Sequence, residues 1–382
     1  MRFLHTADLH LGRQFNGIAL EADQEAILEQ ILHAVIAHRV DVLVIAGDIF
    51  DRAAPPASAV RQFNGFLARI AQETTAAVVM IAGNHDSGDR IESMSILTDR
   101  RRALIRGALC AEEPPLILSD AAGPVAFSAL PFAYEYAARA CFDDENIQNP
   151  EDVLAAEVAA ARRHLPVGAR WVIVAHAFVA GAENSDAERP LARVGGIETV
   201  RPEIFAGAHY VALGHLHRPQ AVGGAHICYS GAPLAFGFDE AEGAKSMNLV
   251  DMDGGGAVQI EVLPFAPLRR VRVLRGTHAE LLLAPPSEDL IKVVLTDPVP
   301  VIDAMKRLRE VFPNACDLTY ARDAAAPEVK SGLARGRQVT DPLTVVGDFL
   351  EGVRGARMGA EELALVARSL RALERDEAGE VA

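Results

Sequence analysis

The sequence predicts an α/β protein in which buried strands and helices build a largely parallel sheet. Five apolar runs of four to six residues are rich in Val, Ile, Leu, Met or Phe, which is typical of buried strands. Helical segments intervene, as expected for βαβ units, and each run ends at a cluster of metal-binding residue types. The five runs span residues 2–7, 41–46, 77–82, 171–175 and 210–213.

Three helices are predicted between these strands, over residues 22–37, 57–72 and 151–163. Prolines stand at or just before the start of the second and third, and proline is well tolerated in the first turn of a helix. Residues 180–200 are polar and contain glycine, so they are predicted to form a surface loop.

The residues that end the five strands are candidate metal ligands. Because ligands of parallel sheets bind at the carboxyl ends of the strands, these side chains are expected to meet at one edge. Seven potential ligands are too many for one ion and suit two. They are Asp8, His10, Asp48, Asn84, His176, His215 and His217.

The residue types indicate how such a site would work. Residues two apart on a strand share a face, so Asp8 can act with His10, and His215 lies on one face with His217. Asp48 is free to bridge two ions. Mixed nitrogen and oxygen ligands suit Mn²⁺, Fe²⁺ or Zn²⁺, and two ions roughly 3.5–4 Å apart can activate a phosphate ester and a water.

His85 neighbours Asn84 but is not needed as a ligand, which suits a proton donor to a leaving oxygen. Asp86 is predicted to orient His85. The other seven histidines lack such context and are expected to be structural or on the surface. They are His5, His33, His38, His164, His209, His226 and His278.

Composition sets further limits. The 382 residues predict two or more domains, and no run of eighteen apolar residues indicates a membrane span. The chain starts with a strand and not with a secretory signal, so a cytoplasmic location is expected. The four cysteines are far apart and are expected to be reduced thiols. The net charge of −15 on its own favours an enzyme with a small substrate over a nucleic-acid protein, although residues 100–102, Arg-Arg-Arg, are a possible DNA contact.

The composition changes after the clusters end. Residues 1–265 hold all five clusters, and 266–322 read as a small α+β domain with strands over 270–275 and 290–296, a helix over 299–311 and a closing strand. Residues 323–340 are predicted to be a linker, and 341–382 to form two amphipathic helices.

The order of the motifs, D-x-H, GD-x-x-D, GNHD, H and GH-x-H, resembles the calcineurin-like metallophosphoesterase superfamily. Within it, several segments closely resemble the SbcD nucleases, the nuclease subunits of SbcCD complexes. These segments are LHTADLHLGR, AGDIFDRAAPP, IAGNHDS, ENSDAERPLARVGG, YVALGHLHRPQ and YSGAPLAFGFDEAEGAKS. The last of them carries no obvious catalytic group.

The resemblance implies a β-sandwich flanked by helices, a small α+β capping domain and C-terminal helices. It implies two Mn²⁺ ions that share Asp48, with His85 as the catalytic histidine. The first ion would be held by Asp8, His10, Asp48 and His217, and the second by Asp48, Asn84, His176 and His215.

The resemblance also implies an activity and partners. The expected activity is Mn²⁺-dependent exonuclease on duplex DNA ends and endonuclease on single strands or hairpins, in DNA recombination, repair and replication. The expected partner is the ATPase subunit SbcC, docked on the C-terminal helices, with a homodimer of the nuclease inside a heterotetramer.

Two alternatives stay open. A free-standing phosphodiesterase or phosphatase for small molecules would share the metal site but would need neither the capping domain nor the C-terminal helices. A non-enzymatic scaffold that has lost its metals is disfavoured by the presence of every ligand and of His85.

Overall fold

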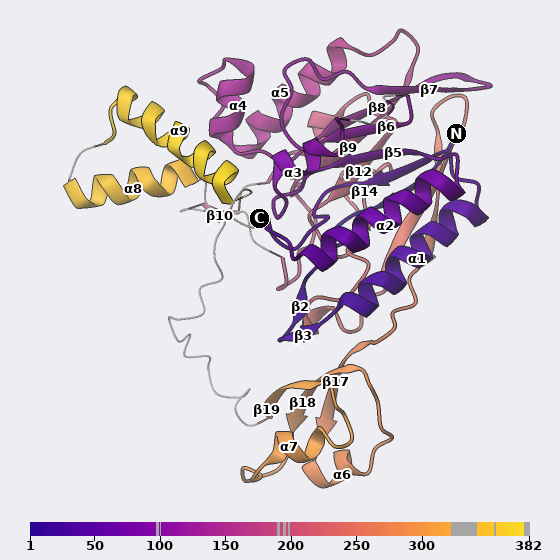
Figure 1. Cartoon of the computed structure of the whole chain (residues 1–382), viewed down its shortest axis with the longest axis vertical. Helices are drawn as coiled ribbons and strands as arrows, with labels where there is room; N and C mark the ends of the chain where they lie inside the picture. The colour runs from indigo at the N-terminus through magenta and orange to yellow at the C-terminus, as the bar shows by residue number, and fades with distance from the viewer. Residues whose placement is uncertain are drawn as a thin grey trace.

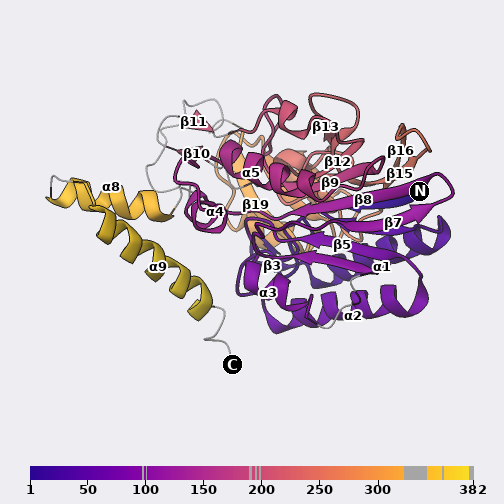
Figure 2. The same cartoon turned by 90° about the horizontal axis from the view of Figure 1, so that it is seen from above.

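The computed structural model describes residues 1–96, 99, 101–188, 192–193, 196–197, 199–321, 342–354 and 357–377. Its main body contains two six-stranded sheets packed face to face (Figure 2). The first sheet has the order β16 (Val258–Pro264), β15 (Ser246–Met252), β1 (Arg2–Thr6), β4 (Val42–Ile45), β5 (Ala77–Ile81), β6 (Ala103–Arg106). The second has the order β13 (Gln220–Ala221), β14 (Ile227–Tyr229), β12 (Tyr210–Gly214), β9 (Arg170–His176), β8 (Gly123–Leu130), β7 (Leu116–Asp120).

The five predicted strands are present, but they divide between the two sheets. β1, β4 and β5 are parallel neighbours in the first sheet, and β9 and β12 are parallel neighbours in the second. The prediction of a single sheet from the strand pattern was therefore wrong, whereas the sandwich implied by the family resemblance is confirmed. All five strands are buried on both faces, so their local patterns look alike whichever sheet they join.

Each sheet has one face toward the other sheet and one face toward helices. Phe3 of β1 packs edge-to-face on Phe127 and Tyr210 of the second sheet, with ring centroids 5.7 and 5.2 Å away. Leu4, which points the opposite way, joins the core beneath α1 (Glu21–Ala37) and α2 (Ala57–Glu73). Trp171 packs under α5 (Pro150–Arg163) on the outer face of the second sheet.

The remaining elements of the body are short. They are β2 (Gln14–Phe15), β3 (Ile18–Ala19), α3 (Gly88–Ser93), α4 (Glu135–Phe142), β10 (Ala192–Arg193), β11 (Gly196–Ile197), and the 3₁₀ turns η1 (Pro202–Phe205) and η2 (Phe238–Glu240).

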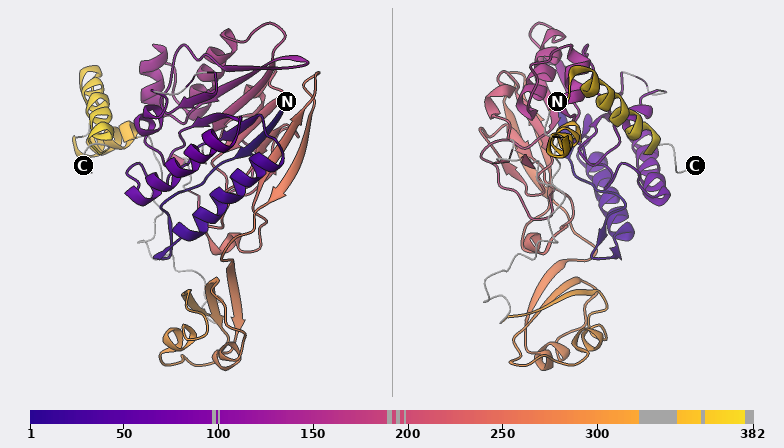
Figure 3. Two further views of the ribbon diagram at one scale, coloured as in Figure 1. Left: turned by 45° about the vertical axis from the view of Figure 1, so that its right-hand side comes forward. Right: turned by 90° about the vertical axis from the view of Figure 1, so that its left-hand side faces the viewer.

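A smaller lobe follows the body and is joined to it near residue 265 (Figures 1 and 3). Its three parallel strands, in the order β17-β18-β19, have a hydrophobic core of their own. The elements are β17 (Val271–Gly276), α6 (His278–Leu282), β18 (Leu290–Leu295), α7 (Ala304–Leu308) and β19 (Ala315–Tyr320). The helix α7 is shorter than the predicted 299–311, because Pro300 and the left-handed Asp303 (φ 52°) precede it.

The lobe contacts the body through few polar groups. Arg269 pairs with Asp23, a carboxylate that is only 1% exposed. The ammonium group of Lys292 lies 5.8 Å from the centre of the Phe238 ring.

Two helices end the described chain, α8 (Pro342–Arg354) and α9 (Ala360–Glu377), and they project beside the body (Figure 1). Several of their apolar side chains are exposed, among them Val345 at 50%, Phe349 at 66% and Leu365 at 56%. The predicted linker, 323–340, lies outside the described residues. In the part of the chain that the structure describes, no helix is long and apolar enough to cross a lipid bilayer.

A buried histidine joins the two sheets. His5 of β1 accepts a hydrogen bond at Nδ1 from the hydroxyl of Tyr210 (3.0 Å) and donates from Nε2 to the carbonyl oxygen of Leu213 (3.1 Å). Burial lowers the pKa of His5 to about 3. His5 is therefore a structural histidine that is neutral when the protein is folded.

The low pKa of His5 predicts a pH-dependent cost. The unfolded chain binds a proton at His5 below pH 6.5 and the folded chain does not, so the free energy of unfolding falls as the pH decreases. His5→Gln is expected to lose less stability than the wild type between pH 7 and pH 5, by about 2 kcal/mol. Urea unfolding at both pH values measures this difference.

His33 offers a matched control, because its side chain is 68% exposed. His33→Gln is expected to follow the wild-type pH dependence. Parallel curves for His5→Gln and the wild type would contradict the assignment of this cost to His5.

Candidate metal centre

The loops after β1, β4, β5, β9 and β12 meet at one edge of the sandwich. They bring together all seven side chains that were predicted as metal ligands. Asn84 is half-buried, and the other six are at most 4% exposed. These six are Asp8, His10, Asp48, His176, His215 and His217.

Most of the ligands lie in turns and not on the strands, which corrects the predicted geometry. Asp8 and His10 follow β1, and His215 and His217 follow β12. Asp8, His10, Asp48 and His215 have positive φ values of 55°, 44°, 49° and 106°. Residues held in this conformation cost of order 1–3 kcal/mol each and are found where the surrounding structure enforces them, often at functional sites. The turns, and not the two-residue alternation of a strand, direct these side chains inward.

Two glycines of the motifs are needed because the loops pack directly on the ligands. A Cβ atom on Gly47, which has a φ of 89°, would lie 2.5 Å from His176 Nδ1. A Cβ atom on Gly83 would lie 2.2 Å from Asp48 Oδ1. Any side chain at either position would therefore displace a candidate ligand.

The first group of donor atoms is formed by loops from both sheets. His10 Nε2 lies 3.2 Å from His217 Nε2 and 3.7 Å from Asp48 Oδ2. Asp8 lies beside them, and its Oδ1 accepts a hydrogen bond from the backbone N–H of His215 (2.9 Å).

The second group shares Asp48 with the first. Asn84 Oδ1 lies 3.0 Å from His176 Nε2 and 3.1 Å from His215 Nδ1. His176 Nε2 is also 3.6 Å from Asp48 Oδ2. Asp48 Oδ2 thus faces donor atoms of both groups.

The orientation of His176 shows that lone pairs converge here. His176 Nδ1 lies 2.9 Å from the carbonyl oxygen of Ala46, so this nitrogen carries the proton. The neutral ring therefore directs the lone pair of Nε2 at Asn84 Oδ1, which is itself an acceptor. Two acceptors 3.0 Å apart repel each other unless a cation lies close to both. The residues present therefore fit a bound metal ion.

The charges of the site agree with this fit. Burial, with a smaller effect of Asp48, raises the pKa of Asp8 well above its usual range. Burial lowers the pKa of His215 to about 3 and also lowers the pKa values of His10 and His176. Neutral imidazoles beside two buried carboxylates form the ligand set of a divalent transition metal.

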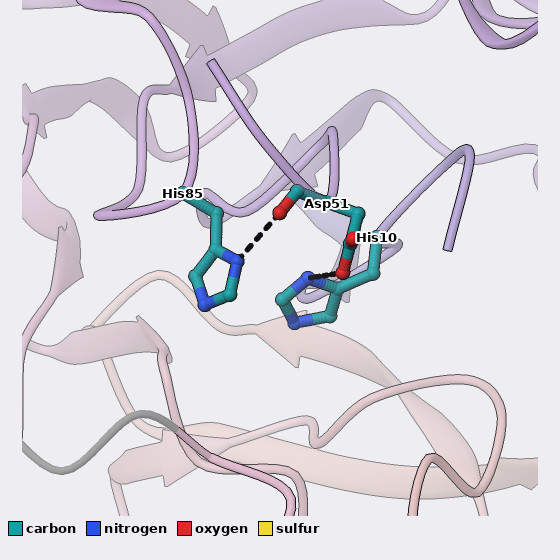
Figure 4. A group of neighbouring side chains, drawn as sticks. All are labelled: His10, Asp51 and His85. Atoms are coloured by element: carbon teal, nitrogen blue, oxygen red, sulfur yellow. Dashed lines mark hydrogen bonds and ion pairs between the residues drawn. The ribbon is translucent and has the colours of Figure 1, made fainter. Parts of the chain in front are cut away.

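His85 lies at the margin of the two groups. Its Nδ1 donates to the carbonyl oxygen of Asp51 (2.8 Å, Figure 4), which leaves Nε2 directed toward Asp48 Oδ2 at 3.8 Å. The backbone N–H of His85 donates to Asp48 Oδ1 (2.9 Å). His85 is therefore oriented by backbone groups, with one ring nitrogen available for proton transfer.

The predicted role of Asp86 in orienting His85 was wrong. Its carboxylate accepts hydrogen bonds from the backbone N–H groups of Ile49, Phe50 and Gly83, at 3.0, 2.9 and 2.9 Å. Asp86 thus ties the loop after β5 to the loop after β4, because a short carboxylate reaches backbone donors of the neighbouring turn more readily than the ring beside it.

Asp51 offers another arrangement of ligand atoms. Those of His10, Asp51 and His85 lie within 4.8 Å of one another (Figure 4). However, His85 Nδ1 is already used by the carbonyl oxygen of Asp51, and the guanidinium of Arg13 lies 3.5 Å from Asp51 Oδ1. A cation is therefore already present at Asp51, and the set around Asp48 fits a metal ion better.

Sequence reasoning missed four residues around His217. Ser185, Glu188 and Glu240 are at most 7% exposed, and the side chain of Lys245 is 9% exposed. Glu240 Oε1 lies 3.0 Å from His217 Nδ1. No spacing in the sequence links these residues to His217. The signal for them was that two segments resembled the SbcD family although they carried no catalytic group.

The other predicted residues lie outside the two donor groups. The seven histidines expected to be structural or exposed contribute no atom to either group, and the four cysteines are free thiols. Arg101 is exposed and pairs with Asp99, and Arg100 lies outside the described residues.

Comparisons with known proteins agree with this geometry. Residues 1–219 match the calcineurin-like phosphoesterase family, and residues 264–353 match the type 5 capsule protein repressor C-terminal domain. Two relatives both bear the name of the SbcD polypeptide of the SbcCD nuclease. The one from Staphylococcus epidermidis is 29% identical over 328 residues, which cover 84% of this chain and 85% of the relative. The one from Staphylococcus saprophyticus is 28% identical over 377 residues, 98% of each chain.

Among solved structures, the chain is similar to the sulfate thiohydrolase SoxB of Thermus thermophilus in complex with glycerol. The sequence identity is 14% and the TM-score 0.35, and the match covers 69% of this chain and 56% of that one.

The shared position of Asp48 predicts how metal affects stability. Mn²⁺ at a concentration of 100 times its dissociation constant is expected to stabilise the metal-free protein by about 2.7 kcal/mol for each site filled. Asp48→Ala is expected to lose this effect, because Asp48 Oδ2 faces both groups. Thermal unfolding with and without Mn²⁺ measures it.

Asp51→Asn is the matched control and is expected to retain the stabilisation. If Asp51→Asn lost it while Asp48→Ala kept it, the ion would be held by His10, Asp51 and His85 instead.

Proposed function

Because the chain belongs to the calcineurin-like phosphoesterase family, we propose that it is the metal-dependent nuclease subunit of an SbcCD-type complex. The two staphylococcal relatives named for the SbcCD nuclease, one of them similar over 98% of this chain, support this substrate class. The proposed activity is ATP-dependent exonuclease on duplex DNA ends and endonuclease on single strands and hairpins, in recombination, repair and replication.

One observation carries the proposal. Two groups of neutral imidazole and oxygen donors share Asp48 Oδ2, which lies 3.7 Å from His10 Nε2 and 3.6 Å from His176 Nε2. We propose that each group holds one Mn²⁺ ion. The first group is Asp8, His10, Asp48 and His217, and the second is Asp48, Asn84, His176 and His215. Bound ions supply Lewis-acid activation of a phosphodiester and of a water molecule.

The residues of the chain arrange the rest of the reaction. Asp48, Asn84 and the four imidazoles orient the scissile phosphate through the ions that they hold. His85 is proposed to donate a proton from Nε2 to the leaving oxygen. The hydrogen bond from its Nδ1 to the carbonyl oxygen of Asp51 supports this role, because it keeps Nε2 directed at the site.

The net charge of −15 is unusual for a protein that binds DNA alone. We propose that an SbcC-type ATPase subunit supplies much of the DNA contact and docks on α8 and α9, whose exposed Val345, Phe349 and Leu365 support a protein-binding surface. The assembly would contain a homodimer of the nuclease within a heterotetramer.

The role of His85 predicts a separation of binding from catalysis. His85→Ala is expected to slow Mn²⁺-dependent cleavage of end-labelled duplex DNA by about 10²- to 10⁴-fold, measured with and without the ATPase subunit. Its Mn²⁺ content should equal that of the wild type, because no donor atom of either group is removed.

His33→Ala is the control, since this exposed histidine pairs only with Glu29. An equally active His85→Ala protein would refute the proton-donor role. Hydrolysis of small phosphodiesters without attack on DNA, even with the partner present, would assign the chain to the small-molecule enzymes.

The tail predicts a second separation. Truncation after Thr340 is expected to leave hydrolysis of bis-p-nitrophenyl phosphate unchanged and to abolish binding to the ATPase subunit, measured by size-exclusion chromatography. Phe349→Asp in the full chain should weaken this binding, because a charge replaces a side chain that is 66% exposed and apolar.

Val167→Asp serves as its control, because Val167 is fully exposed on the body and far from the tail in the sequence. Loss of small-diester hydrolysis on truncation, or unchanged partner binding by both tail variants, would contradict this division of roles.

A further inference from the structure

Two segments singled out in the sequence meet around His217. Residues 183–188 begin the segment ENSDAERPLARVGG, and residues 229–246 form YSGAPLAFGFDEAEGAKS. Neither contributes an atom to the two groups of donor atoms. Both contribute buried polar side chains that contact His217 or its direct partner.

We propose that Glu240 is a positioning residue of the first metal site. Its Oε1 accepts the hydrogen bond from His217 Nδ1 at 3.0 Å, and this bond sets the protonated nitrogen of the ring. The lone pair of His217 then lies on Nε2, which faces His10 Nε2 at 3.2 Å. This inference rests on the proposed function only in taking that place as a metal site.

Glu240 is itself held from several sides. Its Oε1 accepts a second hydrogen bond from Ser185 Oγ (2.8 Å), and its Oε2 pairs with Lys245 Nζ (2.5 Å). Glu240 is 2% exposed, so the carboxylate has one place and one orientation. A carboxylate fixed in this way can act as a template for the ring beside it.

The backbone of His217 is held by the same set of residues. Its N–H donates to Glu188 Oε1, and its carbonyl oxygen accepts from Lys245 Nζ (3.0 Å). Glu188 Oε2 in turn accepts from the backbone N–H of Ser185 (2.7 Å). The ring and both backbone polar groups of one ligand are thus anchored by the two segments.

This support distinguishes His217 from the other imidazoles of the described site. The second ring nitrogen of His176 donates to a neutral backbone carbonyl, that of Ala46. His10 Nδ1 has no hydrogen-bond partner among the described residues, because Asp51 Oδ1 lies 3.8 Å away. A carboxylate partner makes an imidazole a stronger donor to a metal than a neutral carbonyl does. The first site therefore depends on Glu240, whereas the second does not.

Two readouts in the full chain test the proposal. In the metal-free protein, ¹⁵N NMR of the imidazoles should show His217 in the single Nδ1–H tautomer, and Glu240→Ala should give a mixture of tautomers. By titration calorimetry, Glu240→Ala should weaken binding of one of two Mn²⁺ ions by about 10- to 100-fold and leave the other unchanged. Glu240→Gln, which keeps a neutral acceptor, should retain the tautomer and lose less affinity.

Asp23→Asn is the matched control. Asp23 is also a buried carboxylate, paired with Arg269, but it contacts none of the candidate ligands. This variant should be destabilised while keeping the His217 tautomer and both Mn²⁺ affinities. A general loss of stability would affect both variants, so only a positioning role separates them.

Three outcomes would overturn the proposal. They are an unchanged tautomer in Glu240→Ala, equal weakening of both ions, and equal loss of affinity in Asp23→Asn. If Glu240→Ala does not fold, Glu240→Gln decides through affinity: unchanged binding of both ions would refute the role. Failure of the wild type to cut DNA while it binds Mn²⁺ with a single His217 tautomer would refute the nuclease proposal and leave this one standing.

Discussion

The position of Asp48 is the constraint on which the site depends. Its Oδ1 is held by the backbone N–H of His85 (2.9 Å), and its Oδ2 faces His10 and His176, which come from different sheets. For one carboxylate to face both, the ends of β1, β4 and β9 must lie within a few ångströms of one another. The close packing of the sheets around Phe3, Phe127 and Tyr210 provides this, because interiors at crystal-like density leave little freedom to shift.

The same closeness is costly in the absence of a cation. Four ligand residues adopt positive φ values, the lone pairs of His176 Nε2 and Asn84 Oδ1 converge, and burial opposes ionisation of Asp8. A bound divalent ion relieves the electrostatic part of this cost, so metal binding and stability are coupled. His5, a short distance away, illustrates the contrast: both of its ring nitrogens have protein partners, and it needs no ion.

The periphery follows a different rule from the centre. The strongly acidic surface, with a net charge of −15, does not suit DNA on its own, and α8 and α9 expose apolar side chains such as Phe349. Both features make sense together if a partner subunit covers the helices and contributes positive charge. The lobe formed by 271–320 has its own core and touches the body mainly through the Arg269–Asp23 pair and through Lys292 over Phe238, so few groups set its position.

The sequence by itself determined the five strands, the helices α1, α2 and α5 and the seven candidate ligands, because apolar runs and the polar residues that end them are local signals. It did not determine that the strands form two sheets, since strands buried on both faces read alike in either arrangement. It also placed Asp8 and His10 on a strand, whereas left-handed turns direct them inward. Glu188, Glu240 and Lys245 were missed for a related reason. Their roles arise only where chain segments distant in sequence pack on His217, and that packing is decided by tertiary structure.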